Sequence, residues 1–269
     1  MCVLVVVANP VPGISLLVAA NRDEFTERLS APPGELGPGI FGGKDLAAGG
    51  TWLGVNRHSL VVAVTNRRHP PRWKDSASRG MLCLDALRQE NVASIEPLAA
   101  EHVQHGKSAG FNLVSLRDGH GLCWHYDGTL RRVPLDGSLH VISSHRDMDD
   151  PAMPERRVVM NTWTGDGDRD RDHLLERLKE ILRDHSDGGS AICKHADGYG
   201  TVSSTLIVST TAKVGSYAGI PRRSRSSRTR TVVQVFPSAD LQRIRFIVIA
   251  NSLSGHCPPS LRMTSTGLG

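Results

Sequence analysis

The second residue of the chain is a cysteine, and this position gives its thiol a chemistry that an internal cysteine lacks. If the initiator methionine is removed, as a small second residue favours, Cys2 carries both a thiol and a free α-amino group. An α-amine with a pKa of about 7.7 to 8.0 is a usable base near neutral pH, and a thiol with a pKa of about 8.5 is already partly ionised. One residue would then supply both nucleophile and base. Cysteine at position 2 also occurs in proteins where it has no catalytic role.

The motif AANRDE, residues 19–24, places a cation and an anion side by side at the end of a predicted strand. In an antiparallel hairpin, the end of the second strand lies beside the start of the first. Arg22 would then lie close to the thiol and lower its pKa, while Asp23 would orient the α-amine and hold its proton. An exposed ion pair of little energetic value explains the same pattern equally well.

Asn66 ends another predicted strand, which follows the motif GGTWLGVN at residues 49–56. At the end of a buried strand, the side-chain amide of Asn66 can donate a hydrogen bond to an oxyanion, as an acyl-transfer site requires. On the pattern alone, an asparagine that completes the following turn is the commoner case.

Strands at the start of the chain must position these residues. Apolar, mostly β-branched runs at 2–8 and 15–20 flank the turn sequence NPVPG, which predicts an N-terminal hairpin. A second hairpin is predicted from residues 51–56 and 60–66. Between the two hairpins, the glycines and prolines of residues 32–50 predict a loop with little regular structure.

Helices and strands follow in blocks through the rest of the chain. Helical spacing of apolar residues, with Asp75 or Ser76 as the first N-cap, predicts helices at 76–90, 92–105, 155–163 and 172–184. Runs of strand-forming residues separated by Asp-Gly turns predict a meander at 110–117, 121–126, 130–135 and 139–143, followed later by a strand at 201–210. Strands and helices grouped in this way favour antiparallel sheets over a doubly wound parallel sheet. We therefore predict an α+β protein, a four-layer αββα sandwich of two antiparallel sheets.

The composition is that of a globular protein, with 39% hydrophobic and 22% charged residues in 269. No apolar run approaches the roughly 18 residues of a membrane span, and we predict a cytoplasmic protein. The five cysteines include no CxxC pair, which favours reduced thiols. The histidine pairs of the sequence favour structural or solvated roles over metal binding, so no metal site is predicted; they are His102/His105, His120/His125 and His140/His145.

The net charge of +5 comes from the end of the chain, because residues 213–269 contain nine basic residues and one acid, Asp240. We predict one domain over residues 1–212, followed by a divergent, partly disordered basic segment over 213–269. Within it, the Arg- and Ser-rich stretch around residues 221–231 is typical of a solvated segment, and low order is expected from 219 to 231. A strand is expected at 243–250. Nucleic-acid binding by this stretch ranks last among the functions considered.

The motifs combine into a family resemblance that spans about residues 1–212. The chain resembles the NRDE family, also called the transport and Golgi organisation protein 2 family, in the motifs LLVAANRDE at 16–24, GGTWLGVN at 49–56, VTNRR at 64–68, SRG at 78–80, GFNL at 110–113 and YGTVSST at 199–205, besides Met-Cys at the start. Members of that family look like N-terminal nucleophile (Ntn) hydrolases of the cysteine type with an αββα fold. The resemblance implies that Cys2 is the nucleophile, Arg22 and Asp23 the charged pair beside it, and Asn66 an oxyanion donor. Residues 54–66 also resemble the choloylglycine and penicillin acylase group, where an asparagine stands at this point.

The chain departs from the family pattern in two places. The last motif of the family usually reads YGTRS or YGTRT, whereas Val202 takes the arginine position here, so a cation that would stabilise a thiolate is missing. After about Lys213 the family ends in an acidic and aromatic strand, whereas this chain continues into glutamate-free, Ser- and Arg-rich sequence.

Two functions follow as hypotheses, both with a small molecule as substrate or ligand. The first is a cysteine Ntn amidohydrolase acting on a non-peptide amide bond. The second is a non-enzymatic protein of the same fold that binds or traffics haem or another hydrophobic metabolite, since eukaryotic relatives are associated with haem trafficking. Under the second hypothesis haem would be the ligand, and Cys257-Pro258 is one candidate for its attachment.

Overall fold

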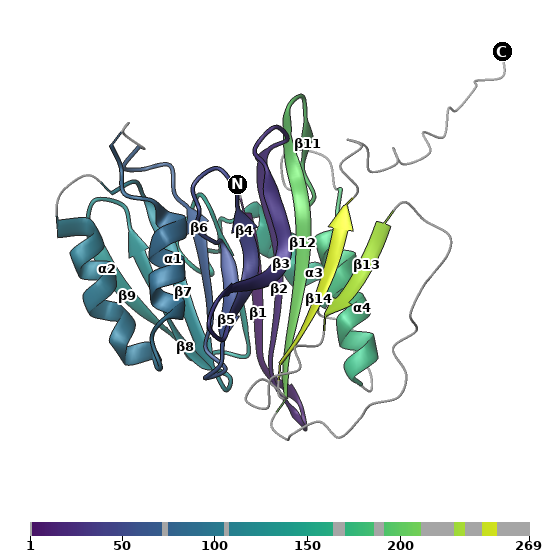
Figure 1. Cartoon of the computed structure of the whole chain (residues 1–269). Helices are drawn as coiled ribbons and strands as arrows, with labels where there is room; N and C mark the ends of the chain where they lie inside the picture. Colours follow the sequence, from purple (N-terminus) through teal and green to yellow (C-terminus); the bar gives the residue numbers. More distant parts are fainter. Residues whose placement is uncertain are drawn as a thin grey trace, which may run out of the picture.

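The computed structural model describes residues 2–71, 75–104, 108–163, 170–185, 191–210, 229–234 and 244–251, the last two ranges by their backbone alone. Two antiparallel sheets stack face to face, and helices lie on their outer sides (Figure 1). Among the described residues each sheet has seven strands. No helix of this part of the chain has the length and apolar character that crossing a membrane would require.

The first sheet carries both ends of the described chain, with β2 and β12 between the first strand, β1, and the last, β14. Its order is β10–β1–β2–β12–β14–β13, with β11 paired to β12. The strands are β1 (Cys2–Val11), β2 (Ile14–Phe25), β10 (Leu139–Ser143), β11 (His195–Ala196), β12 (Tyr199–Thr210), β13 (Thr229–Gln234) and β14 (Ile244–Asn251). The predicted N-terminal hairpin and the strand expected at 243–250 are confirmed as β1–β2 and β14.

The second sheet runs in chain order from β3 to β9. Its strands are β3 (Ser30–Gly37), β4 (Ile40–Asp45), β5 (Leu53–Asn56), β6 (Val61–Asn66), β7 (Phe111–Arg117), β8 (His120–Tyr126) and β9 (Leu130–Leu135). The β5–β6 hairpin is confirmed. The predicted meander is correct in its strands but not in its pairing, because β10 leaves the sheet and pairs with β1.

The prediction of a loop over residues 32–50 is wrong, since most of this stretch forms the β3–β4 hairpin. Its pairing contains two irregularities, so the sequence lacks the regular alternation that marks a strand. A glycine is required within it: a Cβ atom on Gly42 would lie 2.6 Å from the carbonyl oxygen of Leu53 on the neighbouring β5. Such a glycine looks like a loop residue in the sequence but serves close strand packing.

The helices confirm the predicted blocks within a few residues. They are α1 (Arg79–Leu87), α2 (Ile95–Gln104), α3 (Pro154–Trp163) and α4 (Arg171–Leu182), with a short 3-10 turn η1 (Val92–Ser94) before α2. The N-cap of α1 is Ser78, whose hydroxyl accepts a hydrogen bond from the backbone of Met81, and not the predicted Asp75 or Ser76.

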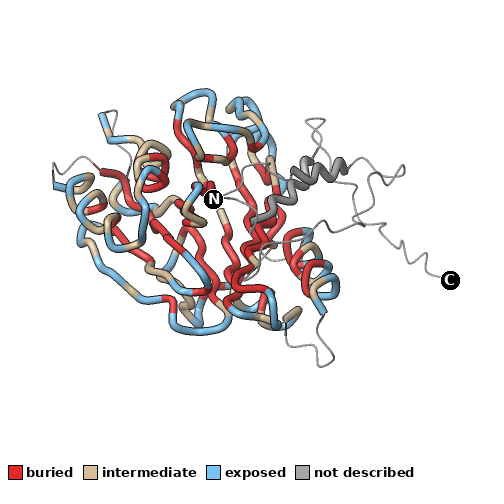
Figure 2. Tube along the Cα trace, turned by 60° about the horizontal axis from the view of Figure 1, so that its bottom comes forward, coloured by how far each residue is buried: buried red, intermediate tan, exposed pale blue. Residues whose placement is uncertain are grey.

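Three layers of buried side chains establish the predicted αββα sandwich. Along β1, alternate residues face opposite sides: Val3, Val5 and Val7 pack toward α3 and α4, whereas Leu4 and Val6 pack against the second sheet. A third cluster joins the second sheet to α1 and α2. Figure 2 shows the central strands as the most continuously buried part of the chain.

The C-terminal strands extend the first sheet, because β14 pairs with β12 and β13 pairs with β14. Low order was expected from residue 219 to 231, and this is wrong for residues 229–231, which belong to β13. Residues 219–228 lie outside the described residues.

Candidate active site

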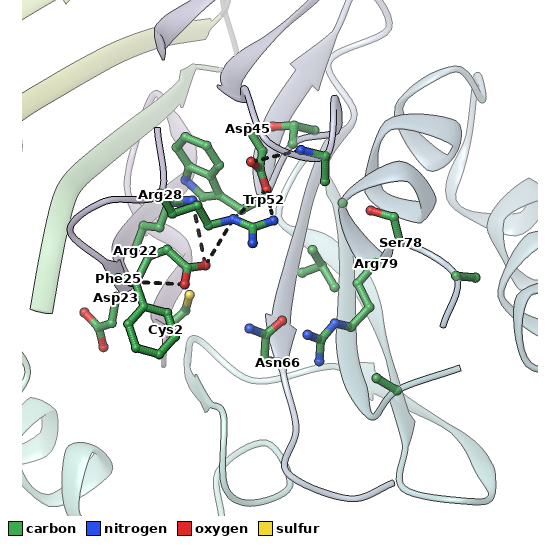
Figure 3. Close-up of a pocket in the computed structure, with 17 residues that line it drawn as sticks. Cys2, Arg22, Asp23, Phe25, Arg28, Asp45, Trp52, Asn66, Ser78 and Arg79 are labelled. Carbon is green, nitrogen blue, oxygen red and sulfur yellow. Dashed lines mark hydrogen bonds and ion pairs between the residues drawn. The ribbon is translucent and has the colours of Figure 1, made fainter. Parts of the chain in front are cut away.

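A pocket of about 280 Å³ lies at the end of the sandwich where β1 begins. All four predicted site residues, Cys2, Arg22, Asp23 and Asn66, line it (Figure 3). The rest of the lining comes from the end of β2 and the residues after it, from β4 to β6, from the start of α1 and the residues before it, and from the segment before β7: Glu24, Phe25, Arg28, Asp45, Ala48, Thr51, Trp52, Val64, Ala77, Ser78, Arg79, Gly80 and Ala109.

Strand pairing places Cys2 as the hairpin argument requires. Cys2 lies opposite Arg22 in the β1–β2 ladder. On the other side of β1, the backbone nitrogen of Cys2 donates a 2.9 Å hydrogen bond to the hydroxyl of Ser144, which follows β10. If Met1 is removed, this nitrogen becomes the α-amine, and Ser144 is already in contact with it.

Arg22 is buried, with its side chain 4% exposed. Its guanidinium carbon lies 4.5 Å from the centre of the Trp52 ring, and its Nη2 forms a 3.8 Å ion pair with Glu24. Its Nη1 is buried without a hydrogen-bond partner among the described residues. Burial lowers the pKa of Arg22, although at neutral pH a guanidinium stays charged. Arg22 therefore brings a desolvated positive charge to the pocket.

Asp23 is also buried, and its Oδ1 accepts a 2.7 Å hydrogen bond from the hydroxyl of Thr201 on β12. The same hydroxyl accepts a 2.9 Å hydrogen bond from the backbone of Lys194. Burial raises the pKa of Asp23 to about 6, against the opposing effects of the Thr201 hydrogen bond and of nearby positive charge. Asp23 is thus an ionised carboxylate at neutral pH, at a cost in folding free energy.

Val202 lies where the pairing of β12 with β2 is irregular, between Thr201 opposite Asp23 and Ser203 opposite Arg22. It does not line the pocket, so position 202 adds no cation to it. Arg28 does line the pocket, but its charge is paired with Asp45 at 2.7 Å.

Asn66 ends β6 and points into the pocket in Figure 3, on the side of Cys2 away from Asp23. Beside it, the Nη1 of Arg79 donates a 2.9 Å hydrogen bond to the carbonyl oxygen of Gly110. The motifs GGTW and SRG meet at this wall: a Cβ atom on Gly50 would lie 2.3 Å from the backbone carbonyl carbon of Gly80. The two motifs are therefore complementary halves of one pocket wall.

The thiol of Cys2 does not have the lowered pKa that the sequence suggested. Arg22 and the positive charge of the amino terminus act in the expected direction, but burial has the larger effect, so the pKa of Cys2 is raised. The thiol is therefore protonated at neutral pH. Among the described cysteines, Cys2 lines the pocket, whereas Cys83, Cys123 and Cys193 do not.

Sequence reasoning missed several residues of this site. Three of them stand in motifs that carried the family resemblance, and this membership was the signal that could have found them: Trp52, Arg79 and Thr201. Ser144 belongs to no such motif. Its signal would have been the pairing of β10 with β1, which joins residues far apart in the chain.

The two stacked antiparallel sheets with helices on their outer sides define the class: this is a protein with the fold of the Ntn hydrolases. A worm enzyme with that fold, the Caenorhabditis elegans N-acylethanolamine-hydrolyzing acid amidase ortholog, matches with a TM-score of 0.53 over 76% of this chain and 92% of its own, at 12% sequence identity. The sequence model of the family described as Transport and Golgi organisation 2 matches residues 1–235, and the chain belongs to this family.

Curated mammalian relatives carry the family name. The mouse Transport and Golgi organization 2 homolog is 32% identical over 124 residues, which are 43% of this chain and 45% of the relative. The bovine homolog is 28% identical over 151 residues, which are 50% of this chain and 53% of the relative. The matched stretch thus spans about half the length of these relatives.

Proposed function

We propose that the chain is a cysteine Ntn amidohydrolase that cleaves a non-peptide amide bond of a small molecule. The observation that supports this most is the placement of Cys2, whose side chain lines the pocket while its backbone nitrogen is bonded to Ser144. We further propose that Met1 is removed, since only then does this nitrogen become a base.

In the first half of the reaction, the α-amine of Cys2 takes the thiol proton as the sulfur attacks the carbonyl carbon of the amide. This base is required because burial raises the pKa of the thiol. The carbonyl oxygen becomes an oxyanion, which accepts a hydrogen bond from the side-chain amide of Asn66. The C–N bond then breaks, the leaving amine takes the proton from the α-ammonium group, and a thioester on Cys2 remains.

In the second half, a water molecule attacks the thioester and gives a proton to the α-amine. The C–S bond breaks, the proton passes to the sulfur, and a carboxylic acid leaves. The two charged residues act through the nucleophile: Arg22 favours the thiolate, and Asp23 favours the protonated α-amine.

The pocket favours a small substrate or the end of a larger one. Its volume of about 280 Å³ lies at the lower limit of the roughly 300 to 1,000 Å³ usual for small-molecule sites. Phe25, Trp52 and Val64 provide apolar surface beside the charged groups. A mixed lining of this kind fits an amide with an apolar portion.

The alternative from the sequence, haem or hydrophobic-metabolite binding without catalysis, has less support. No histidine is among the described residues that line the pocket, and Cys2 is the cysteine there. Cys257, the other candidate haem ligand, lies outside the described residues. Cytoplasmic location likewise stays a prediction.

Two measurements test the proposal. Mass analysis of the mature protein should show Cys2 as the first residue, because a retained Met1 blocks the base. A cysteine-reactive acyl probe should then acylate Cys2 ahead of Cys83, Cys123 and Cys193 in the wild type. The labelled peptide should be absent in Cys2→Ala and present in the matched control Cys83→Ala. Retention of Met1 would overturn the proposal, and so would modification of all four thiols to the same extent.

A third variant separates the oxyanion role of Asn66 from simple access to the sulfur. Asn66→Ala should slow turnover of the acyl probe by about 10² to 10³-fold, the loss usual for one oxyanion donor. Alkylation of Cys2 by iodoacetamide forms no oxyanion, so its rate should change by less than about twofold. If Asn66→Ala slowed acyl-probe turnover and alkylation by the same factor, Asn66 would not be an oxyanion donor.

A further inference from the structure

Three side chains of metal-ligand type meet beyond the end of α4, on residues that do not line the pocket. His185 follows α4, Cys193 precedes β11 and His195 begins β11. Their ligand atoms all lie within 4.8 Å of one another. None of these three residues belongs to the histidine pairs considered from the sequence.

Two of the three separations are close to those of a tetrahedral metal site. Bonds of about 2.0 to 2.1 Å to histidine nitrogen and 2.3 Å to sulfur imply, at the tetrahedral angle, about 3.3 Å between two nitrogens and about 3.6 Å between nitrogen and sulfur. The Nε2 atoms of His185 and His195 are 3.1 Å apart. The Sγ of Cys193 lies 3.5 Å from Nε2 of His195. An ion bound by all three residues would bring the ligand atoms of His185 and Cys193, which lie within 4.8 Å of each other, to tetrahedral distance.

The backbone around the cluster is held in place. Cys193 donates a 2.8 Å backbone hydrogen bond to the carbonyl oxygen of Asp184, and the backbone of Ile192 donates a 3.3 Å bond to the Asp184 carboxylate. Nδ1 of His185 contacts the carbonyl oxygen of Arg183, which leaves Nε2 directed toward the cluster. Bonds of this kind, which orient a histidine ring through its second nitrogen, are the usual support of metal ligands.

We propose that His185, Cys193 and His195 bind one Zn²⁺ ion, with water as the fourth ligand. Two imidazoles and a thiolate suit zinc, whereas Mg²⁺ and Ca²⁺ prefer oxygen ligands. Binding replaces waters of the hydrated ion, and the thiol of Cys193 loses its proton to solvent. Both histidines are exposed, so solvent reaches the fourth position.

The bound ion would fasten the β11–β12 hairpin to the end of α4. Lys194, between two of the ligands, donates its backbone hydrogen bond to Thr201, and Thr201 donates to Asp23. The zinc site therefore supports the segment that holds the buried carboxylate of the pocket. This inference does not depend on the proposed hydrolysis.

The test uses the full chain without a histidine tag, stripped of metal by a chelator and titrated with Co²⁺ and then Zn²⁺. We expect one Co²⁺ per chain, a sulfur-to-cobalt charge-transfer band, and displacement of Co²⁺ by Zn²⁺ but not by Mg²⁺. Cys193→Ser should lose the band. His185→Ala and His195→Ala should bind about 100-fold more weakly, whereas His120→Ala and Cys83→Ala should bind as the wild type does.

A second readout guards against misfolded variants. Zn²⁺ should raise the thermal midpoint of the wild type and of His120→Ala, but not that of His195→Ala, whose replaced side chain is exposed. Absence of the charge-transfer band in the wild type, or its survival in Cys193→Ser, would overturn the proposal. Loss of the band in Cys2→Ser would do the same, since the metal would then lie at the pocket.

Discussion

Replacement of Asp23 by asparagine tests whether the pocket holds an ionised carboxylate at the expense of stability. Asparagine has nearly the same shape, and its Oδ1 can still accept the hydrogen bond from Thr201. The substitution therefore removes the charge and leaves the packing almost unchanged. We expect Asp23→Asn to stabilise the fold at neutral pH and to slow acylation of Cys2, because the α-ammonium group loses its counter-charge.

The size and sign of the effect follow from the pKa. Burial raises the pKa of Asp23 from 3.8 to about 6, so the folded state binds this proton more tightly than the unfolded state. The ionised group therefore costs stability fully above pH 6, and the cost disappears as the pH falls below 3.8. At 1.36 kcal/mol per pKa unit, the cost is about 3 kcal/mol near pH 7.5 and about 1.6 kcal/mol near pH 5.

Urea denaturation of wild type and Asp23→Asn at these two pH values measures the effect. The gain in unfolding free energy should fall by about half from pH 7.5 to pH 5. Asp147 is a control of opposite sign, because its hydrogen bonds with Arg131 and Arg67 lower its pKa. Asp147→Asn should therefore destabilise the fold at neutral pH. An Asp23→Asn protein that is less stable than wild type at pH 7.5, or whose gain does not depend on pH, would refute the reasoning.

Three further substitutions probe the surroundings of the pocket. Ser144→Ala should slow acyl turnover about tenfold and change the free energy of unfolding by about 1 kcal/mol. The acidic limb of its pH profile should move to lower pH, because the α-ammonium group loses a hydrogen-bond acceptor. Ser144→Thr should restore both the rate and the profile. Gly50→Ala should destabilise the fold by about 1 to 3 kcal/mol in urea denaturation, because its Cβ atom would clash with the backbone of Gly80. The control Gly37→Ala has no atom within 4 Å of the added carbon, so its free energy of unfolding should change by less than about 0.5 kcal/mol. Thr201→Val should destabilise the fold by about 1 to 3 kcal/mol at neutral pH, since it removes the donor to ionised Asp23; equal stability would contradict this.

The parts of the site that depend on local pairing could be predicted from the sequence. A hairpin with a short turn brings position 2 opposite the end of its second strand, and the structure places Cys2 opposite Arg22. Asn66 likewise lies at the end of a strand whose pattern was regular.

The parts of the site that depend on pairing between distant segments could not be predicted from the sequence. Ser144 reaches Cys2 only because β10 leaves its neighbours and pairs with β1, and Thr201 reaches Asp23 only because β12 pairs with β2. The thiol pKa was misjudged for a related reason: charge is visible in a sequence, whereas the depth of burial emerges only from the packed fold. The β3–β4 hairpin was missed because its glycines serve close packing.

The central position of β12 also affects when the pocket can form during protein synthesis. Cys2 and Asp23 belong to the β1–β2 hairpin, but Thr201, the hydrogen-bond donor to Asp23, lies far along the sequence on β12. Until that part of the chain has emerged and paired with β2, Asp23 lacks the hydrogen bond from Thr201 and the pocket is incomplete. Under the proposed function, a chain truncated before β12 would carry the Cys2 thiol without a complete pocket, and we expect no acylation of it.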